Sequence, residues 1–327
     1  MGAFLNRRRL ETAERTEKLR QELIEAEHTC SDAACVYATG SFGRGEASLH
    51  SDLDIFIVGK GTKAKPALSG LDEILIKADL IEATRKQNFP DFSGDGEYLK
   101  HHTVAELAER LGTPEDDVVN TFTARLLLLL ESSPLLGIPV YQDITKAVIA
   151  AYWGDYEDHK TRFMPAFLAN DILRMWRTFC VNYEARTQKE PEEKKAKRKI
   201  KNYKLKHSRL LTCYSALLYL LAIYSKNGTV SPGNTIHMIS LTPTARLEWL
   251  LEQTELADAR TTIEQLLKVY EDFLAFTDAS ESELIERFLD KAKSAQYRDT
   301  ANQFGDLVFK ALNAIGKGSP FHRLIVV

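Results

Sequence analysis

The 327-residue sequence predicts an α+β protein with a small α/β head followed by an all-helical domain. Two strand-like runs, Val36–Thr39 and Ile55–Val58, flank a glycine-rich turn near the start of the chain. The segment Pro134–Pro139 is interpreted as a hinge, and after it the apolar residues recur mainly at helical spacing. We therefore expect one domain at residues 1–140 and a second at residues 141–327.

The head is expected to alternate helices with short strands. Residues 5–28 combine alternating charge with leucines at helical spacing, which predicts an amphipathic first helix. Residues 59–69 are predicted to form a loop, residues 71–86 a helix, and residues 97–102 a third strand. The apolar positions that define the helix over residues 71–86 are Leu71, Ile74, Leu75, Ala78 and Ile81.

Two further helices are predicted before the hinge. Thr103 is a suitable cap for a helix over residues 103–111, because Glu106 follows three residues later and completes a capping box. Pro114 suits the first turn of the next helix, which is predicted to run without a break over residues 113–130.

Composition and charge limit the class of protein. The net charge of −3 argues against nucleic acid wrapping around the whole chain, although it leaves room for a local basic patch. The four cysteines show no C-x-x-C spacing, so we expect reduced thiols in the cytoplasm and no zinc site. The N-terminus reads as a charged helix rather than a signal peptide. Polar residues interrupt Leu210–Tyr224, which predicts a buried helix and no membrane association.

The most informative motif is a D-x-D pair that follows a Gly-Ser turn. Asp52 and Asp54 are two residues apart, and such residues point to the same face of a strand. Two carboxylates on one face repel each other unless a cation lies between them, and a hard divalent cation with oxygen ligands fits. Gly40 and Ser41 lie just upstream, where backbone N–H groups and a hydroxyl can hold phosphates. The alternative to a metal site is an ordinary β-hairpin that exposes two acidic side chains.

This combination resembles the signature of the polymerase-β type of nucleotidyltransferase. The matching residues are Gly40, Ser41, Gly43, Gly45, Ser51, Asp52 and Asp54. Residues 120–137 also resemble the segment after the catalytic sheet in PII-uridylyltransferase-like proteins. The resemblance implies transfer of a nucleoside monophosphate from an NTP or dNTP onto a hydroxyl, with release of pyrophosphate. It further implies two Mg²⁺ (or Mn²⁺) ions held by Asp52 and Asp54.

The same resemblance gives roles to the turn residues. Gly40 and Ser41 are expected to hold the phosphates, and Gly43 and Gly45 to keep the turn open. Ser51 is expected to cap the start of the strand and to orient Asp52. Arg44 is expected either to steer phosphate or to be an exposed turn residue.

Relatives of this type also carry a third carboxylate, which acts as the base for the incoming hydroxyl. Asp95 is the first candidate, although a residue between two glycines is also a common turn former. Asp91, Glu97 and Glu131 are the alternatives. If none of them serves, the protein is an inactive or weakly active member.

A basic run over residues 194–209 is the second candidate site. In oligonucleotide-synthesising relatives a lysine and a serine of the helical domain clamp the triphosphate, and Lys204 and Ser208 resemble that pair. The alternatives are a solvated basic face and a surface that binds a nucleic-acid backbone. Elsewhere, Asp171 and Arg174 can pair at i, i+3, which favours a structural role between the domains, and contact of Arg174 or Arg177 with phosphate is the alternative.

The basic run favours a nucleotide or a nucleic-acid 3′ end as the acceptor. Compact bacterial enzymes of this kind often make signalling oligonucleotides or modify RNA ends in antiviral defence and toxin systems, which implies a role of that sort and a partner protein encoded in the same operon. Transfer of AMP or UMP to a protein, or of a nucleotide to a kanamycin-type antibiotic, stays open. So does a binding module, namely an inactive nucleotidyltransferase fold acting as antitoxin or adaptor.

Overall fold

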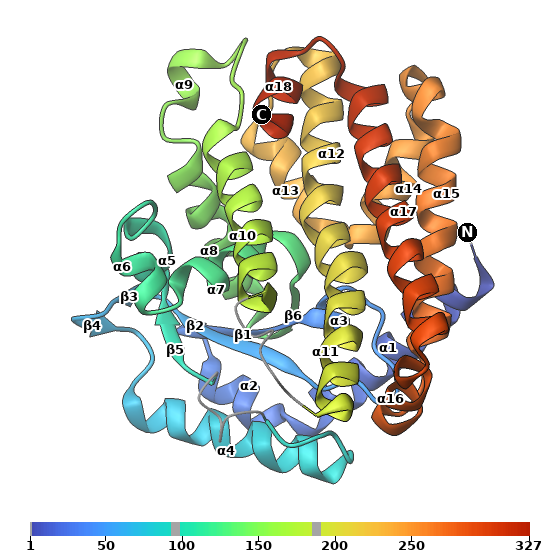
Figure 1. The fold of residues 1–327 in the computed structure, drawn as a ribbon. Helices are drawn as coiled ribbons and strands as arrows, with labels where there is room; N and C mark the ends of the chain where they lie inside the picture. Colours follow the sequence, from blue (N-terminus) through green and yellow to red (C-terminus); the bar gives the residue numbers. More distant parts are fainter. Residues whose placement is uncertain (1, 93–98, 185–190) are drawn as a thin grey trace. The chain divides into compact units, whose positions relative to one another are not determined.

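The computed structural model describes residues 2–92, 99–184 and 191–327. It divides into two compact units, one over Ala3–Asp155 and the other over Tyr156–Val327 (Figure 1). The first unit contains a small mixed sheet and the second is helical, which confirms the predicted α+β head and helical body. Helix α8 (Ile138–Tyr152) spans the boundary predicted at residue 140 and belongs to the first unit.

The first unit is built on a four-stranded sheet in the order β5-β2-β1-β6. Its strands are β1 (Ala34–Thr39), β2 (Asp54–Gly59), β5 (His101–Thr103) and β6 (Ser133–Leu136). Strand β1 runs antiparallel to both β2 and β6, and β2 runs parallel to β5. In the β1–β2 register Thr39 lies opposite Asp54, so the end of β1 meets the start of β2.

Strand β6 forms where the sequence predicts a hinge, so that prediction is wrong. Pro134 lies opposite Tyr37 on an edge strand, and an edge is where a sheet tolerates a proline. Helix α1 also holds this edge, because the Arg20 guanidinium donates to the carbonyls of Pro134 and Leu135. The loop predicted over residues 59–69 is likewise corrected: it contains a small hairpin of β3 (Gly61–Thr62) and β4 (Lys65–Pro66).

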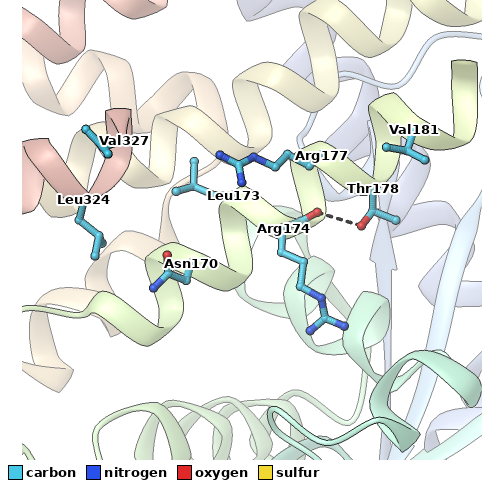
Figure 2. A pocket seen from close by; sticks show the side chains of 8 residues that line it. All are labelled: Asn170, Leu173, Arg174, Arg177, Thr178, Val181, Leu324 and Val327. Carbon is cyan, nitrogen blue, oxygen red and sulfur yellow. Dashed lines mark hydrogen bonds between the residues drawn. The ribbon is translucent and has the colours of Figure 1, made fainter.

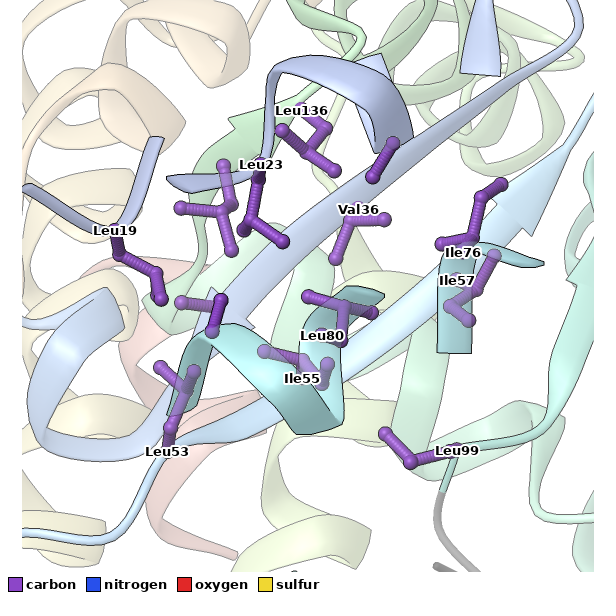
Figure 3. Close-up of a cluster of buried hydrophobic side chains, with 14 of the residues drawn as sticks. Leu19, Leu23, Val36, Leu53, Ile55, Ile57, Ile76, Leu80, Leu99 and Leu136 are labelled. Carbon is purple, nitrogen blue, oxygen red and sulfur yellow. The ribbon is translucent and has the colours of Figure 1, made fainter. Parts of the chain in front are cut away.

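One face of the sheet packs on three helices: α1 (Ala3–Glu22), α2 (Ile24–Cys30) and α4 (Gly70–Lys86). Figure 3 shows the resulting cluster, in which Val36, Ile55 and Ile57 of the strands meet side chains of all three helices. The single first helix predicted over residues 5–28 is therefore two helices, which meet at Leu23.

Helix α4 is confirmed, but its buried face differs from the predicted one. Ile76 and Leu80 enter the core, whereas Leu71, Ile74 and Leu75 are exposed. Apolar spacing alone does not decide between two neighbouring stripes of one helix when both carry apolar residues.

The opposite face of the sheet is covered by α5 (Val104–Glu109), α7 (Thr121–Glu131) and α8. The Tyr37 ring stacks on Phe56 there, and its hydroxyl donates to the carbonyl of Ala124 in α7. The capping box of Thr103 and Glu106 is confirmed at the start of α5.

The continuous helix predicted over residues 113–130 is in fact α6 (Glu115–Val118) followed by α7. The break lies at Asn120, whose φ is +64°. The break allows Asp116 of α6 to reach the fully buried Arg125 of α7, which also donates to the Tyr152 hydroxyl and to the carbonyl of Leu107. A buried ion pair of this kind fixes the two short helices relative to each other.

The second unit consists of helices over the residues described. They are α9 (Tyr156–His159), α10 (Ala166–Glu184), α11 (Glu192–Lys204), α12 (Leu210–Asn227), α13 (Pro232–Ser240), α14 (Pro243–Glu252), α15 (Ala257–Thr277), α16 (Glu281–Leu289), α17 (Lys291–Gly316) and α18 (Pro320–Val326). A π-helical segment, Leu205–Arg209, joins α11 to α12 in one continuous helix.

Helix α12 forms the centre of this unit. The continuous helix Glu192–Asn227 is long and apolar enough to cross a membrane, but 72% of its most apolar window is buried among the other helices. A buried window of this kind is typical of a core helix, as the sequence predicts for Leu210–Tyr224.

Candidate functional site

The centre of the candidate site is the contact between the Gly40 backbone and the Asp54 side chain. Gly40 follows β1 directly with φ of +63°, a conformation that favours glycine. A Cβ built on Gly40 would lie 2.7 Å from Oδ2 of Asp54. The Asp54 carboxylate therefore lies against the Gly-Ser turn, as the paired ends of β1 and β2 require.

Asp52 and Asp54 share one side of the chain where β2 begins. Leu53 and Ile55 are buried in the core, whereas the two aspartates that alternate with them are exposed. Asp54 is the first residue of β2 and Asp52 precedes the strand, so the pair lies at the mouth of the strand rather than within it.

Carboxylate oxygens beside a turn that has no side chain at Gly40 suit a hard divalent cation such as Mg²⁺, so the residues present fit the ion that the resemblance implies. Within residues 2–92, 99–184 and 191–327, no group of three or more His, Cys, Asp or Glu side chains is arranged to hold a metal. The described chain thus offers two carboxylates, not three.

The turn after β1 is a single helical turn, α3 (Gly40–Gly43), packed tightly on the end of α7. A Cβ on Gly43 would lie 1.9 Å from the carbonyl oxygen of Glu131 and 2.8 Å from that of Ala38. Gly43 therefore permits close backbone packing, whereas the sequence predicts that it keeps the turn open. Gly45 has φ of +70° and completes the reversal of the chain.

A buried ion pair holds the turn. The Arg44 guanidinium donates to Glu46 at 2.9 Å and to Oε2 of Glu131 at 2.8 Å, and all three residues are at most 7% exposed. The other oxygen of Glu131 accepts a hydrogen bond from the backbone N–H of Gly40. Arg44 is therefore not an exposed turn residue, and its contacts support a positioning role. Direct contact with phosphate stays a prediction.

Helix α1 fixes the loop that leads from the turn to Asp52. The Thr12 hydroxyl accepts a hydrogen bond from the N–H of Ala47, and the Arg8 guanidinium donates to the Ala47 carbonyl. Arg15 donates to the Ser48 carbonyl and lies over the ring of Phe42. The sequence alone did not identify these contacts of Arg8, Thr12 and Arg15 with the loop. A signal was present, since polar residues at i, i+4 and i+7 of an amphipathic helix can line its inner face.

Ser51 closes a short turn rather than contacting a distant element. Its hydroxyl accepts a hydrogen bond from the N–H of Ser48 at 2.9 Å, and its own N–H donates to the Ser48 carbonyl. This turn sets where the chain enters Asp52, in keeping with a role in placing that residue. A direct contact of Ser51 with nucleotide stays a prediction.

The candidates for the third carboxylate fall into three groups. Asp95 and Glu97 lie outside the described residues, so the first candidate stays a prediction. Asp91 is exposed and accepts a 3.4 Å hydrogen bond from Arg85. Glu131 lies beside the site but both of its oxygens are engaged, by Gly40 and by Arg44.

Lys204 and Ser208 belong to the second unit, at the junction of α11 with the π-helical segment. Lys204 is exposed, whereas Ser208 is 8% exposed and its hydroxyl lies 3.4 Å from that of Tyr270. The two side chains thus differ in environment, and their role as a triphosphate clamp stays a prediction.

Arg174 and Arg177 line a pocket of about 400 Å³ between α10 and α18. The i, i+3 pair of Asp171 and Arg174 is present at 3.8 Å. Figure 2 shows the Arg177 side chain directed along Leu173 toward α18, whereas Arg174 points away from α18. The pocket walls combine these cations with apolar side chains. Contact of either arginine with phosphate stays a prediction.

A glycine-containing turn packed against a strand that carries carboxylates is suited to binding phosphate esters. The site therefore belongs to the class of phosphate-binding sites. Residues 17–126 match the family model described as "Nucleotidyltransferase domain". The matched range contains the turn, both aspartates and most of the sheet. The match over residues 17–126 is consistent with the polymerase-β-like superfamily, and the nucleotidyltransferase resemblance read from the sequence is confirmed. A search of the curated proteins finds no match. The domain supports a general nucleotidyl-transfer function.

Proposed function

We propose that this protein transfers a nucleoside monophosphate from an NTP or dNTP onto a hydroxyl of a nucleotide or of a nucleic-acid 3′ end, without a template. The observation that carries the proposal is the Asp54 carboxylate lying against the Gly40 turn, inside the segment that matches the nucleotidyltransferase family. This contact sets a carboxylate beside backbone and hydroxyl groups that suit a triphosphate.

Each residue of the site has a defined task in this proposal. Asp52 and Asp54 would hold Mg²⁺ or Mn²⁺, whose charge offsets that of the triphosphate and of the departing pyrophosphate. Gly40 and Ser41 receive the phosphates. The acceptor oxygen bonds to the α-phosphorus while the bond from that phosphorus to the pyrophosphate oxygen breaks. Asp95 takes the proton of the acceptor hydroxyl.

The turn is held in place by the side chains around it. Glu131 binds the Gly40 N–H and Arg44 together, and Thr12 and Arg15 of α1 hold the following loop. Such fixed surroundings favour reaction because little ordering remains to be done when the substrate binds.

In this proposal the first unit, Ala3–Asp155, acts as the nucleotidyltransferase domain and the second, Tyr156–Val327, as a helical domain that binds substrate or nucleotide, with Lys204 and Ser208 on the triphosphate. The protein works in the cytoplasm, and its product serves antiviral defence together with a partner protein from the same operon. Basic side chains of α11 favour a phosphate-bearing acceptor over a neutral one.

Incubation with each radiolabelled NTP and dNTP, followed by sizing of the products, tests the proposal. We expect label in oligonucleotides or at nucleic-acid 3′ ends, formed only with Mg²⁺ or Mn²⁺. Asp54→Asn should abolish this label, whereas Asp32→Asn, the same change before the other end of β1, should not. Label that migrates with protein would instead indicate protein AMPylation or uridylylation. No product with any nucleotide would indicate a binding module.

A further inference from the structure

A basic groove lies within the helical unit, whereas the turn and the aspartates belong to the first unit. It has a volume of about 370 Å³ and lies between α11, with the start of the π-helical segment, and α17, with α16 at its side. Figure 1 labels these three helices. Its lining residues are Lys199, Asn202, Tyr203, Lys206, Phe288, Ser294, Ala295, Arg298 and Ala301.

The lining residues follow the faces of two helices. Along α11 and the π-helical segment they come at i, i+3, i+4 and i+7, starting at Lys199. Along α17, Ser294, Arg298 and Ala301 come at i, i+4 and i+7, and Ala295 lies three residues before Arg298. Residues at these spacings share one helix face. The groove is therefore a single surface built by two facing stripes rather than a gap at the end of a loop.

Three cations and no carboxylate line this groove. Lys199 and Arg298 form no ion pair with any residue in the described ranges, whereas two neighbours in the basic run do: Lys195 with Glu192 and Lys197 with Glu281. Lys206 is fixed by a hydrogen bond from its ammonium to Asn302 at 3.0 Å. Like charges that lie close together without counter-charges repel each other. Binding of an anion would therefore lower the electrostatic repulsion among these cations.

The rest of the lining suits an organic anion rather than a bare ion. Asn202 and Ser294 add hydrogen-bonding groups, and the buried rings of Tyr203 and Phe288, 5.7 Å apart, form a rigid apolar floor. Lys206 also lies in the π-helical turn, an irregularity that is frequent at functional sites. An arginine with two lysines matches the oxygens of adjacent phosphates better than a single carboxylate.

We propose that this groove binds a nucleotide-sized ligand that carries two or more phosphate groups. Lys199, Lys206 and Arg298 bind the phosphates, and the Tyr203–Phe288 floor supports the organic part. None of its lining residues belongs to the Gly40–Ser41 turn, to the aspartate pair or to the pair Lys204 and Ser208, so it is proposed as a separate site. Its cations are side chains, so ligand binding here requires no divalent metal.

Calorimetric titration of the full chain with inorganic tripolyphosphate in EDTA tests this site. We expect binding by the wild type, and a loss of about tenfold or more in affinity for Lys199→Ala and for Arg298→Ala. The matched controls are Lys194→Ala on α11 and Lys293→Ala on α17, which remove the same charge from the same helices outside the groove. The Asp52→Ala, Asp54→Ala double variant should bind tripolyphosphate as the wild type does.

Two results would overturn the proposal. In the first, the groove variants and the control variants bind tripolyphosphate equally well, which would mean general attraction to a basic helix. In the second, a six-residue oligothymidylate binds in EDTA while tripolyphosphate does not, which would identify a nucleic-acid surface instead. These titrations measure binding and not turnover. Neither result would therefore contradict the nucleotidyl-transfer proposal, which the labelling experiment tests separately.

Discussion

Gly40 has little freedom to change, and a substitution there acts directly on Asp54. Its φ of +63° disfavours any side chain, and a Cβ at this position would lie 2.7 Å from Asp54 Oδ2, so the Asp54 side chain would have to shift. Gly40→Ala should cost roughly 1–3 kcal/mol of stability and displace the Asp54 carboxylate. A displacement of about 1 Å in a catalytic group lowers a rate by about 10²-fold, so we expect a loss of that order in steady-state turnover.

Gly70→Ala is the matched control for that change. A Cβ on Gly70 meets no atom within 4 Å, and the residue begins helix α4, where alanine is favoured. Turnover and melting temperature of this variant should equal or exceed those of the wild type. An unchanged rate for Gly40→Ala would show that the turn does not position Asp54.

The third carboxylate is tested by comparing Asp95→Asn with Glu131→Gln. Asp95→Asn should lower the rate by about 10² or more, the scale of positioned proton transfer, with little change in triphosphate affinity. It should also remove the acid limb of the pH–rate profile. Glu131→Gln should keep that limb, because Glu131 binds Gly40 and Arg44 and positions the turn. A full-rate Asp95→Asn enzyme would move the search to Asp91 and Glu97.

At the scale of elements, helix α1 supports the site through the loop before Asp52. Thr12→Val removes the acceptor for the buried N–H of Ala47, which should cost about 1–3 kcal/mol of stability. Turnover should fall more than triphosphate affinity, because the loop sets the position of Asp52. Melting temperature, kcat and KM measure these effects.

Thr16→Val is the control for this helix. The Thr16 hydroxyl donates only to the carbonyl of Thr12 within the helix, so the same substitution one turn later should leave kcat near the wild-type value. Equal losses in both variants would mean that α1 acts through general stability and not through the loop.

Local chemistry made several elements predictable. The capping box of Thr103 and Glu106 begins α5 as expected, and the apolar strands β1 and β2 lie where the sequence places them. The strand at Pro134 was missed because its place at a sheet edge depends on β1 and on Arg20, which are both far away in sequence. Such partners are not visible in local spacing.

The same reason explains what was missed in the site. The D-x-D motif and the Gly-Ser turn are contiguous in sequence, so their chemistry can be read directly. The supporting groups are Thr12, Arg44 and Glu131, which meet only after folding. Arg44 illustrates the limit: in sequence it is a turn residue, but in the fold it is buried between two carboxylates.

At the scale of the whole molecule, the stability of the protein should depend on His207. The residue is fully buried, its Nδ1–H donates to the carbonyl of Tyr203, and its ring stacks on Phe273. Burial lowers the pKa of His207 from 6.5 to about 4. Between these values the unfolded chain binds the proton and the folded chain does not, so stability falls as the pH falls.

This titration predicts a loss of up to roughly 3 kcal/mol between pH 6.5 and pH 4, on the scale of 1.36 kcal/mol per pKa unit. Urea unfolding as a function of pH measures it. His207→Phe should reduce the slope in this window, whereas His159→Gln, at an exposed position, should not. Burial also lowers the pKa values of His101 and His102, so part of the slope should persist in both variants. Identical slopes in wild type and His207→Phe would contradict the assignment.

The most direct test of nucleotidyl transfer is the rate of pyrophosphate release with Mg²⁺ by the wild type and by the Asp52→Ala, Asp54→Ala double variant. Both side chains are exposed, so their removal should leave the fold intact, which circular dichroism can verify. We expect the wild type to release pyrophosphate from at least one NTP or dNTP and the folded double variant to release none. Undiminished release by the folded double variant would contradict the account.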